Sequence, residues 1–254
     1  MITLKTKPRL FGVSLRIMRL RSAGLSLVAA LLLGALQVQA LAQTQTTLQS
    51  SADAAAAKII TAVKVNDASA VKTLALQTSN INAQEAAFPN NTALHWAVWE
   101  NATQALEVLL SQPKIEVDTV NSVNETPLMI AALHGNLAMI VRLLKADAYP
   151  AKPGWTALHY AATNGHVEAM KLLLEAHAYI DAESPNKTTP LMMAARSGQI
   201  LAVKYLLDEG ADATLKNSQG WSAVEFAESV KATDIALGLK SRVAKLKARE
   251  TVQP

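Results

Sequence analysis

Apolar and small residues recur in a fixed pattern over most of the chain. Five strings begin with Thr or Ser and continue through Leu or Val to an Ala, at residues 92–97, 126–131, 156–161, 189–194 and 222–227. Their first residues are 34, 30, 33 and 33 positions apart. Each of the first four strings is followed by a second apolar string with helical spacing, at residues 105–110, 139–144, 169–174 and 202–207. The pattern predicts pairs of short helices repeated along the chain.

Residue types at fixed places in each unit explain how a helix pair forms. The hydroxyl of the leading Thr can accept a backbone N–H at a helix start, and Pro127 and Pro190 follow at the first helical position, where a missing N–H costs nothing. Nine residues after the Thr stand residues that tolerate positive φ and end the first helix: Asn101, Gly135, Gly165 and Gly198. We expect the Leu of each string in the core and the Ala where neighbouring helices meet. One pair cannot bury its apolar side alone, so the pairs should stack.

With these strings the chain resembles the ankyrin-repeat family, whose unit of about 33 residues opens its first helix with Thr-Pro-Leu-His-x-Ala. The resemblance covers about residues 52–245. It implies an all-α fold, an ankyrin-repeat solenoid of stacked helix-turn-helix units with short β-turn fingers. It also implies that His95 and His159, in the fourth place of their strings, bond to the backbone of the neighbouring finger.

The same register divides the chain into parts. We expect a polar tether at 43–51 and an ankyrin-repeat domain at 52–254. Within the domain the N-terminal cap is 52–86, the repeats are about 87–120, 121–150, 151–183 and 184–216, and the C-terminal cap is 217–254. The N-terminal cap should hold helices at 54–65 and 68–76, and the C-terminal cap a long charged helix from Thr233 to Ala248.

One finger should be shorter than the others. Only six residues separate Tyr149 from Thr156, against nine at the corresponding place of the next unit. The difference of three residues predicts a notch in the surface that the fingers form.

The first 42 residues have the three parts of a secretory signal. Six basic and no acidic residues precede an apolar run of 14 residues at 23–36, and Ala40, Leu41 and Ala42 form a cleavage box before Gln43. As a helix the run would be roughly 21 Å long, against about 30 Å for the hydrocarbon core of a bilayer. We therefore expect a signal peptide at 1–42, removed on export, and a periplasmic bacterial protein. Cleavage after Ala40 and an uncleaved inner-membrane anchor facing the periplasm are the alternatives.

Charge and composition exclude several classes of function. The chain has 24 Lys and Arg against 20 Asp and Glu, but six of the basic residues lie in the first 42, which leaves 18 against 20 in residues 43–254. This balance does not favour nucleic-acid binding, and the basic cluster at 240–249 is interpreted as a solvated helix face. Since there is no Cys, disulfides, thiolate metal sites and thiol catalysis are excluded.

The sequence contains no catalytic, cofactor or metal motif. The ten Gly residues form no phosphate loop, no G-x-S-x-G or His-Glu-x-x-His string is present, and no two of the five His stand four positions apart. We therefore expect a non-catalytic protein without cofactor or metal. The alternative, suggested by similar periplasmic proteins, is an accessory, weakly catalytic or metal-dependent factor in envelope or oxidative-stress protection.

The resemblance implies a protein-protein interaction module that binds its partner through the concave surface of the fingers and first helices. We call this surface the inner strip. Its residues that the repeat does not need for folding are the candidate partner contacts: Phe88, Trp99, Glu100, Val123, Glu125, His134, Lys152, Trp155, Asn164, Arg196 and Trp221. For Trp155 and Trp221 the alternative is packing on the adjacent finger. We expect a monomer with an unidentified protein partner, no nucleic acid, and no stable membrane insertion once the signal is cleaved.

Overall fold

The structure is a computed structural model that describes residues 37–39, 41–45, 54–78, 80–87 and 89–250. The chain divides into two units, Met1–Ser51 and Ala52–Pro254. In the first unit the described residues are helical and exposed. Most of the expected signal peptide and tether, including Ala40 at one cleavage position, lies outside the described residues.

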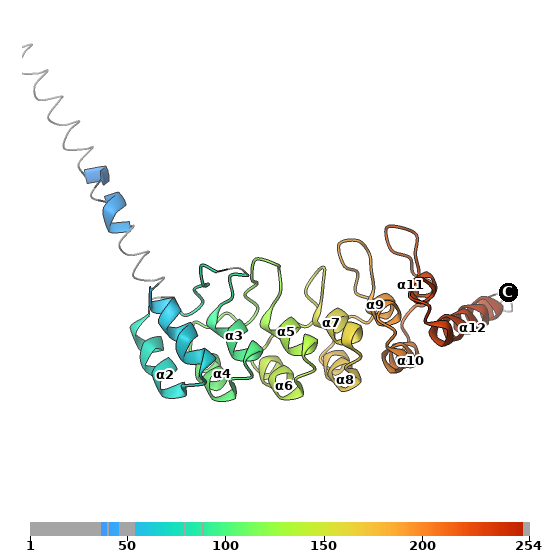
Figure 1. Cartoon of the computed structure of the whole chain (residues 1–254), viewed down its shortest axis with the longest axis horizontal. Helices are drawn as coiled ribbons and strands as arrows, with labels where there is room; N and C mark the ends of the chain where they lie inside the picture. The colour runs from blue at the N-terminus through green and yellow to red at the C-terminus, as the bar shows by residue number, and fades with distance from the viewer. Residues whose placement is uncertain (1–36, 40, 46–53, 79, 88, 251–254) are drawn as a thin grey trace, which may run out of the picture. The chain divides into compact units, whose positions relative to one another are not determined.

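The second unit is a row of helix pairs (Figure 1). The helices in chain order are a helix over 54–64, α2 (Ala68–Gln77), α3 (Ala93–Trp99), α4 (Thr103–Leu110), α5 (Pro127–Leu133), α6 (Leu137–Lys145), α7 (Ala157–Asn164), α8 (Val167–Glu175), α9 (Pro190–Arg196), α10 (Ile200–Asp208), α11 (Ala223–Ser229) and α12 (Thr233–Glu250). The first helices α3, α5, α7, α9 and α11 pack successively on one another, and so do the second helices α6, α8 and α10. This is the all-α stack of helix-turn-helix units that the sequence predicts.

Each leading Thr is the N-cap residue of its first helix, as predicted, although the Thr156 hydroxyl forms no cap hydrogen bond to the backbone. The hydroxyls of Thr92, Thr126 and Thr189 accept the backbone N–H three residues further on, at 3.3–3.4 Å. Pro127 and Pro190 occupy the first helical position. The chain then reverses at the four predicted residues, which all have positive φ of 54–71°: Asn101, Gly135, Gly165 and Gly198.

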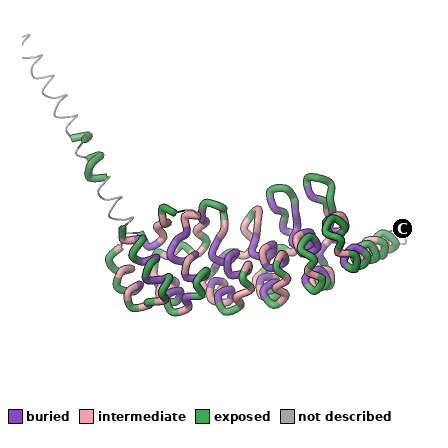
Figure 2. Tube along the Cα trace, viewed as in Figure 1, coloured by how far each residue is buried: buried purple, intermediate pink, exposed green. Residues whose placement is uncertain are grey.

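The core lies between the layer of first helices and the layer of second helices (Figure 2). Leu94, Leu128, Leu158 and Leu191 are at most 1% exposed, and the Ala that closes each of the first four strings is fully buried. Both predictions are confirmed. Burial of one such Leu contributes about 1.5–3 kcal/mol. Because each pair shares its core with its neighbours, the stability is distributed along the row.

Loops that we call fingers precede the first helices. Each turns at one residue with positive φ, two positions before the leading Thr or Ser: Asn90, Asn124, Gly154, Lys187 and Gly220. Four fingers are closed by a backbone hydrogen bond of 2.9–3.0 Å, at 85–91, 121–125, 184–188 and 217–221. These closed turns are the short β-turn fingers that the resemblance implies.

The finger before α7 is narrower than those before α9 and α11 (Figure 1), as the spacing predicts. Among the described residues, no backbone hydrogen bond joins 151–155 across this finger or to a neighbouring finger. The fingers before α3 and α5, in contrast, are joined from Ser122 N to Pro89 O at 2.8 Å. The short finger instead makes a side-chain contact, because Lys152 Nζ donates to Asn124 Oδ1 at 3.1 Å.

Helix pairs cover both ends of the row. At the N-terminal end, α2 packs on α4, and the amide of Asn82 bonds to Lys114 O and Glu116 N at 2.8 and 2.9 Å. At the other end, α12 continues to Glu250, two residues beyond the predicted Ala248, and packs more closely on α11 than on α10. No helix in the described part of the chain is both long and apolar enough to cross a bilayer.

Candidate protein-binding surface

The structure describes ten of the eleven candidate partner contacts, and Phe88 lies outside the described residues. The exposed side chains are those of Trp99, Glu100, Val123, His134, Asn164, Arg196 and Trp221, and the half-buried ones are those of Glu125, Lys152 and Trp155. All ten belong to fingers or to the C-terminal ends of first helices. The inner strip therefore has two rows of candidate contacts, one on the fingers and one at the C-terminal ends of the first helices. Their role in binding stays a prediction.

The Trp side chains of the inner strip have different surroundings. Trp99 is 47% exposed, and its ring lies edge-on to His134 of the next repeat, with centroids 5.0 Å apart. Trp155 is half-buried against His159 at 5.2 Å, and Trp221 lies against a Phe of α11 at 5.4 Å. Trp155 and Trp221 thus each pack on an aromatic side chain of the first helix of their own unit. Trp99 offers the most exposed ring of the three.

Two histidines are part of the fold, as the resemblance implies. His95 Nε2 lies 2.9 Å from Glu125 O, and His159 Nε2 lies 2.9 Å from Thr188 O, each on the next finger. Nδ1 of each ring accepts the backbone N–H of the leading Thr, at 3.3 and 3.2 Å. Because a carbonyl only accepts and an N–H only donates, both rings are neutral with the proton on Nε2. Burial lowers the pKa of both rings, and that of His159 to about 4.

At the N-terminal end of the inner strip, a carboxylate is paired within the chain. Glu85 accepts the indole N–H of Trp96 at 2.7 Å. Lys64 Nζ lies 3.7 Å from the Glu85 carboxylate and 3.5 Å from the centre of the Trp96 ring. The ammonium of Lys64 therefore neutralises the Glu85 carboxylate and lies over the face of the Trp96 ring. Glu85 thus obtains its counter-charge from within the chain.

One repeat further on, a second carboxylate has no such cation. Glu125 accepts the phenol O–H of Tyr160 at 2.9 Å and a side-chain N–H of Asn121 at 3.2 Å. None of the ion pairs between described residues includes it. Burial and the hydrogen bond to the carboxylate raise the pKa of Tyr160, so the phenol stays a donor. Glu125 is therefore a fixed, half-buried acceptor with free lone pairs.

Sequence reasoning missed the aromatic partners of these two carboxylates. Trp96 and Tyr160 stand four positions after the leading Thr, at a place that the repeat leaves variable. The corresponding residues of the other units are Ile, Met and Phe. An aromatic side chain with a polar atom, in place of a purely apolar one, is the signal that would have found them.

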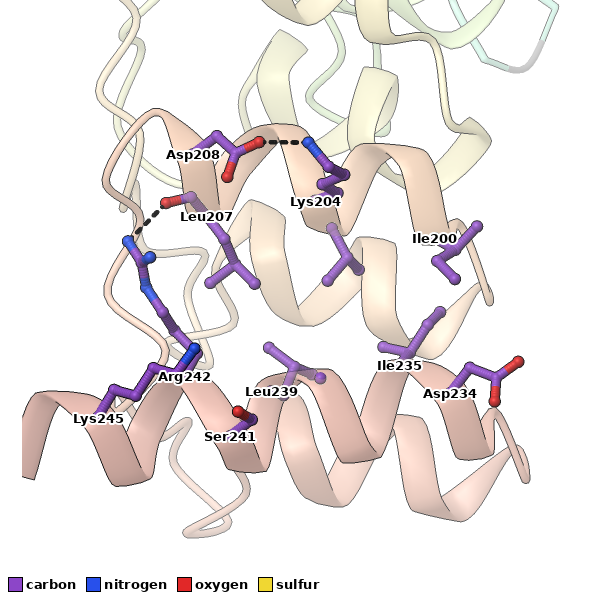
Figure 3. A pocket seen from close by; sticks show the side chains of 12 residues that line it. Ile200, Lys204, Leu207, Asp208, Asp234, Ile235, Leu239, Ser241, Arg242 and Lys245 are labelled. Carbon is purple, nitrogen blue, oxygen red and sulfur yellow. Dashed lines mark hydrogen bonds and ion pairs between the residues drawn. The ribbon is translucent and has the colours of Figure 1, made fainter.

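Away from the inner strip, a groove of about 310 Å³ opens between α10 and α12 (Figure 3). Leu207, Ile235 and Leu239 line it with apolar side chains, and charged residues stand around them. Within the described residues, no group of three or more His, Cys, Asp or Glu is placed to hold a metal ion.

Comparison with known families agrees with this architecture. A family model described as ankyrin repeats in three copies matches residues 59–153, 113–184, 139–217 and 176–245. The chain belongs to the ankyrin-repeat family. Its matched region runs from the N-terminal cap into α12 and includes every finger. As an ankyrin-repeat protein it is a protein-protein interaction module, which confirms the coarser part of the predicted function.

Curated proteins similar to this ankyrin-repeat protein differ widely in name. Transient receptor potential cation channel subfamily A member 1 from Homo sapiens is 32% identical over 161 residues, 59% of this chain and 14% of that protein. Rabankyrin-5 from Mus musculus is 28% identical over 139 residues, 52% and 12% of the two chains. SMC5-SMC6 complex localization factor protein 1 from Homo sapiens is 34% identical over 116 residues, 44% and 10%. The chain thus spans 14% or less of the length of these three relatives.

Proposed function

We propose that this ankyrin-repeat protein is exported to the bacterial periplasm, where it binds a partner protein through the inner strip without catalysing a reaction. The observation that carries the binding part of this proposal is Glu125, which Tyr160 and Asn121 hold in place and which forms no ion pair with any described residue. A half-buried carboxylate without a counter-charge costs free energy. A Lys or Arg side chain of a partner would supply that charge.

Trp99 supplies the apolar part of the proposed surface. Trp99 is 47% exposed, and its ring contact is with His134, itself an exposed residue. Large aromatic side chains are enriched among the residues that dominate binding energies. The partner segment should therefore carry one basic and one apolar side chain.

Binding is tested with the partner isolated on the immobilised protein from a periplasmic extract and then purified. Replacing Trp99 with Ala and Glu125 with Gln together should weaken the measured affinity by about 2 kcal/mol, roughly thirtyfold. Glu175→Gln, the same change of charge on an exposed side chain of α8, is the matched control and should bind normally. If the folded double variant binds its partner at wild-type strength, the inner strip is not the binding surface.

Export is tested by fractionation and intact mass. The basic segment, the short apolar run and the small residues Ala40 and Ala42 support a mature protein in the periplasmic fraction that begins at Gln43 or Leu41. A chain of full-length mass in the membrane fraction would contradict release and favour the anchored alternative.

A further inference from the structure

The groove between α10 and α12 is apolar along its length. Ile235 and Leu239 point from α12 toward α10 (Figure 3), and both are nearly or fully buried. Ile200, at one end of the groove, is 53% exposed. The groove lies on second helices, apart from the fingers, so it is distinct from the inner strip.

Three of the five charged side chains that line the groove are satisfied within the chain. Lys204 Nζ pairs with Asp208 at 2.7 Å, and Arg242 Nη2 donates to a backbone carbonyl of α10 at 2.9 Å (Figure 3). The other two, Asp234 and Lys245, form no ion pair with any described residue. They stand eleven residues apart on α12, roughly 16 Å along the helix axis. One end of the groove is therefore acidic and the other basic.

We propose that α12 pairs with α12 of a second copy of this chain, antiparallel and around a two-fold axis. Asp234, Gly238, Ser241 and Lys245 all line the groove and follow one another at spacings of four, three and four residues, so they share one face of the helix. In an antiparallel pair centred between Gly238 and Ser241, each Asp234 lies opposite Lys245 of the second copy. The two-fold axis makes this pairing twice, and both charges left over in the groove are matched.

The charges also exclude the parallel arrangement. Parallel α12 helices would bring like charges together at both ends, which is unfavourable, whereas the antiparallel pair is attractive at both ends. The arrangement differs from the monomer expected from the sequence, because the pattern of α12 alone does not show which of its charges are already paired.

Gly238 fits a close approach of a second helix. A Cβ atom added there would meet no atom within 4 Å, so packing within the chain does not require glycine. Glycine in a helix interior is destabilising relative to alanine. Without a Cβ at the centre of the proposed contact, two helix backbones can come closer together.

The experiment is sedimentation equilibrium of the purified protein from micromolar to millimolar concentration. We expect reversible association to twice the mass of one chain. Asp234→Lys and Lys245→Asp should each weaken dimerisation about tenfold or more, because each change turns two attractive contacts into two repulsive ones. The double exchange should restore wild-type dimerisation. Lys247→Asp makes the same charge change at an exposed position of α12 outside this groove, and should have little effect.

Gly238→Arg is a second, independent test. The Cβ of the new side chain would meet no atom within 4 Å in the single chain, so circular dichroism and thermal unfolding should match those of the wild type, while the dimer is lost. A wild-type protein that stays monomeric up to millimolar concentration overturns the proposal. So does a dimer that persists in Gly238→Arg, or a charge exchange that fails to restore association.

Discussion

Replacing His95 and His159 with Met should remove an acid sensitivity of the first helices. The chain itself shows that Met fits this place, because Met129 and Met192 stand there in two other units. The Sδ atom of each lies 3.4 Å from the backbone N of the leading Thr, and both side chains are 1% exposed. The double variant should therefore fold with the same helix starts but without a titrating ring.

The magnitude follows from the pKa of His159. Burial lowers that pKa from 6.5 to about 4 in the folded chain, whereas the unfolded chain titrates near the usual value. Above pH 6.5 both states are neutral and the stability is fully present. As pH falls from 6.5 toward 4, only the unfolded state takes up the proton, so the free energy of unfolding decreases by about 1.4 kcal/mol per pH unit. At pH 5 the loss from His159 alone is about 2 kcal/mol, and His95 adds to it.

The assay is urea unfolding followed by circular dichroism at pH 8, 7, 6 and 5 for both proteins. The quantity of interest is the difference in unfolding free energy between wild type and variant at each pH. Asp118 and Asp181, whose carboxyl pKa values burial raises, are the same in both proteins and cancel in the difference. Wild type should lose at least about 2 kcal/mol relative to the variant between pH 8 and 5. A difference that does not change with pH would refute the neutral, buried state of the two rings.

Two further predictions concern stability. Leu158→Ala removes a fully buried side chain of α7 and should lower the unfolding free energy by about 2–5 kcal/mol and broaden the transition; a loss below about 0.5 kcal/mol would show that Leu158 is not core. Gly135→Ala and Gly198→Ala form a matched pair, since both residues have positive φ. A Cβ atom at position 135 would lie 2.6 Å from the His166 ring, whereas one at position 198 would meet no atom within 4 Å. Gly198→Ala should cost roughly 1–2 kcal/mol and Gly135→Ala more; equal losses in urea unfolding would mean that the His166 ring moves aside freely.

The sequence predicts the fold in detail because the repeat is built from short-range chemistry. The bond from the leading Thr hydroxyl reaches three residues, and the residue with positive φ follows nine positions after the Thr. Each of these contacts lies within one unit and recurs, so the spacing of a few residue types is enough to find it. Even the shortened finger before α7 follows from a count of residues between Tyr149 and Thr156.

The candidate site was harder to predict because its contacts join different units. Tyr160 and Glu125 are 35 residues apart in the chain, and Lys152 and Asn124 are 28 apart. The repeat fixes where such side chains start but not which of them meet, since that depends on rotamers and on the length of each finger. The sequence could therefore name Glu125 as a candidate contact but not show that Tyr160 fixes it and that it has no counter-charge. The orientation of α12, which opens the groove beside α10, is equally a property of the assembled row.

The position of Glu125 in the repeat supports the proposal that its carboxylate takes part in binding. The residue just before the leading Thr or Ser is of four different types in the five units: Asn91, Glu125, Trp155, Thr188 and Trp221. The fold thus accepts a buried amide, an aromatic ring or a hydroxyl there, and it does not need a negative charge. A half-buried carboxylate costs more free energy than those neutral groups unless a cation pairs with it.

Glu85, which lies on the preceding finger, obtains that cation from Lys64. Glu125 has two hydrogen-bond donors that hold it in place, and it forms no ion pair with a residue that the structure describes. This difference between the two carboxylates supports the proposal that Glu125 pairs with a basic side chain of a partner.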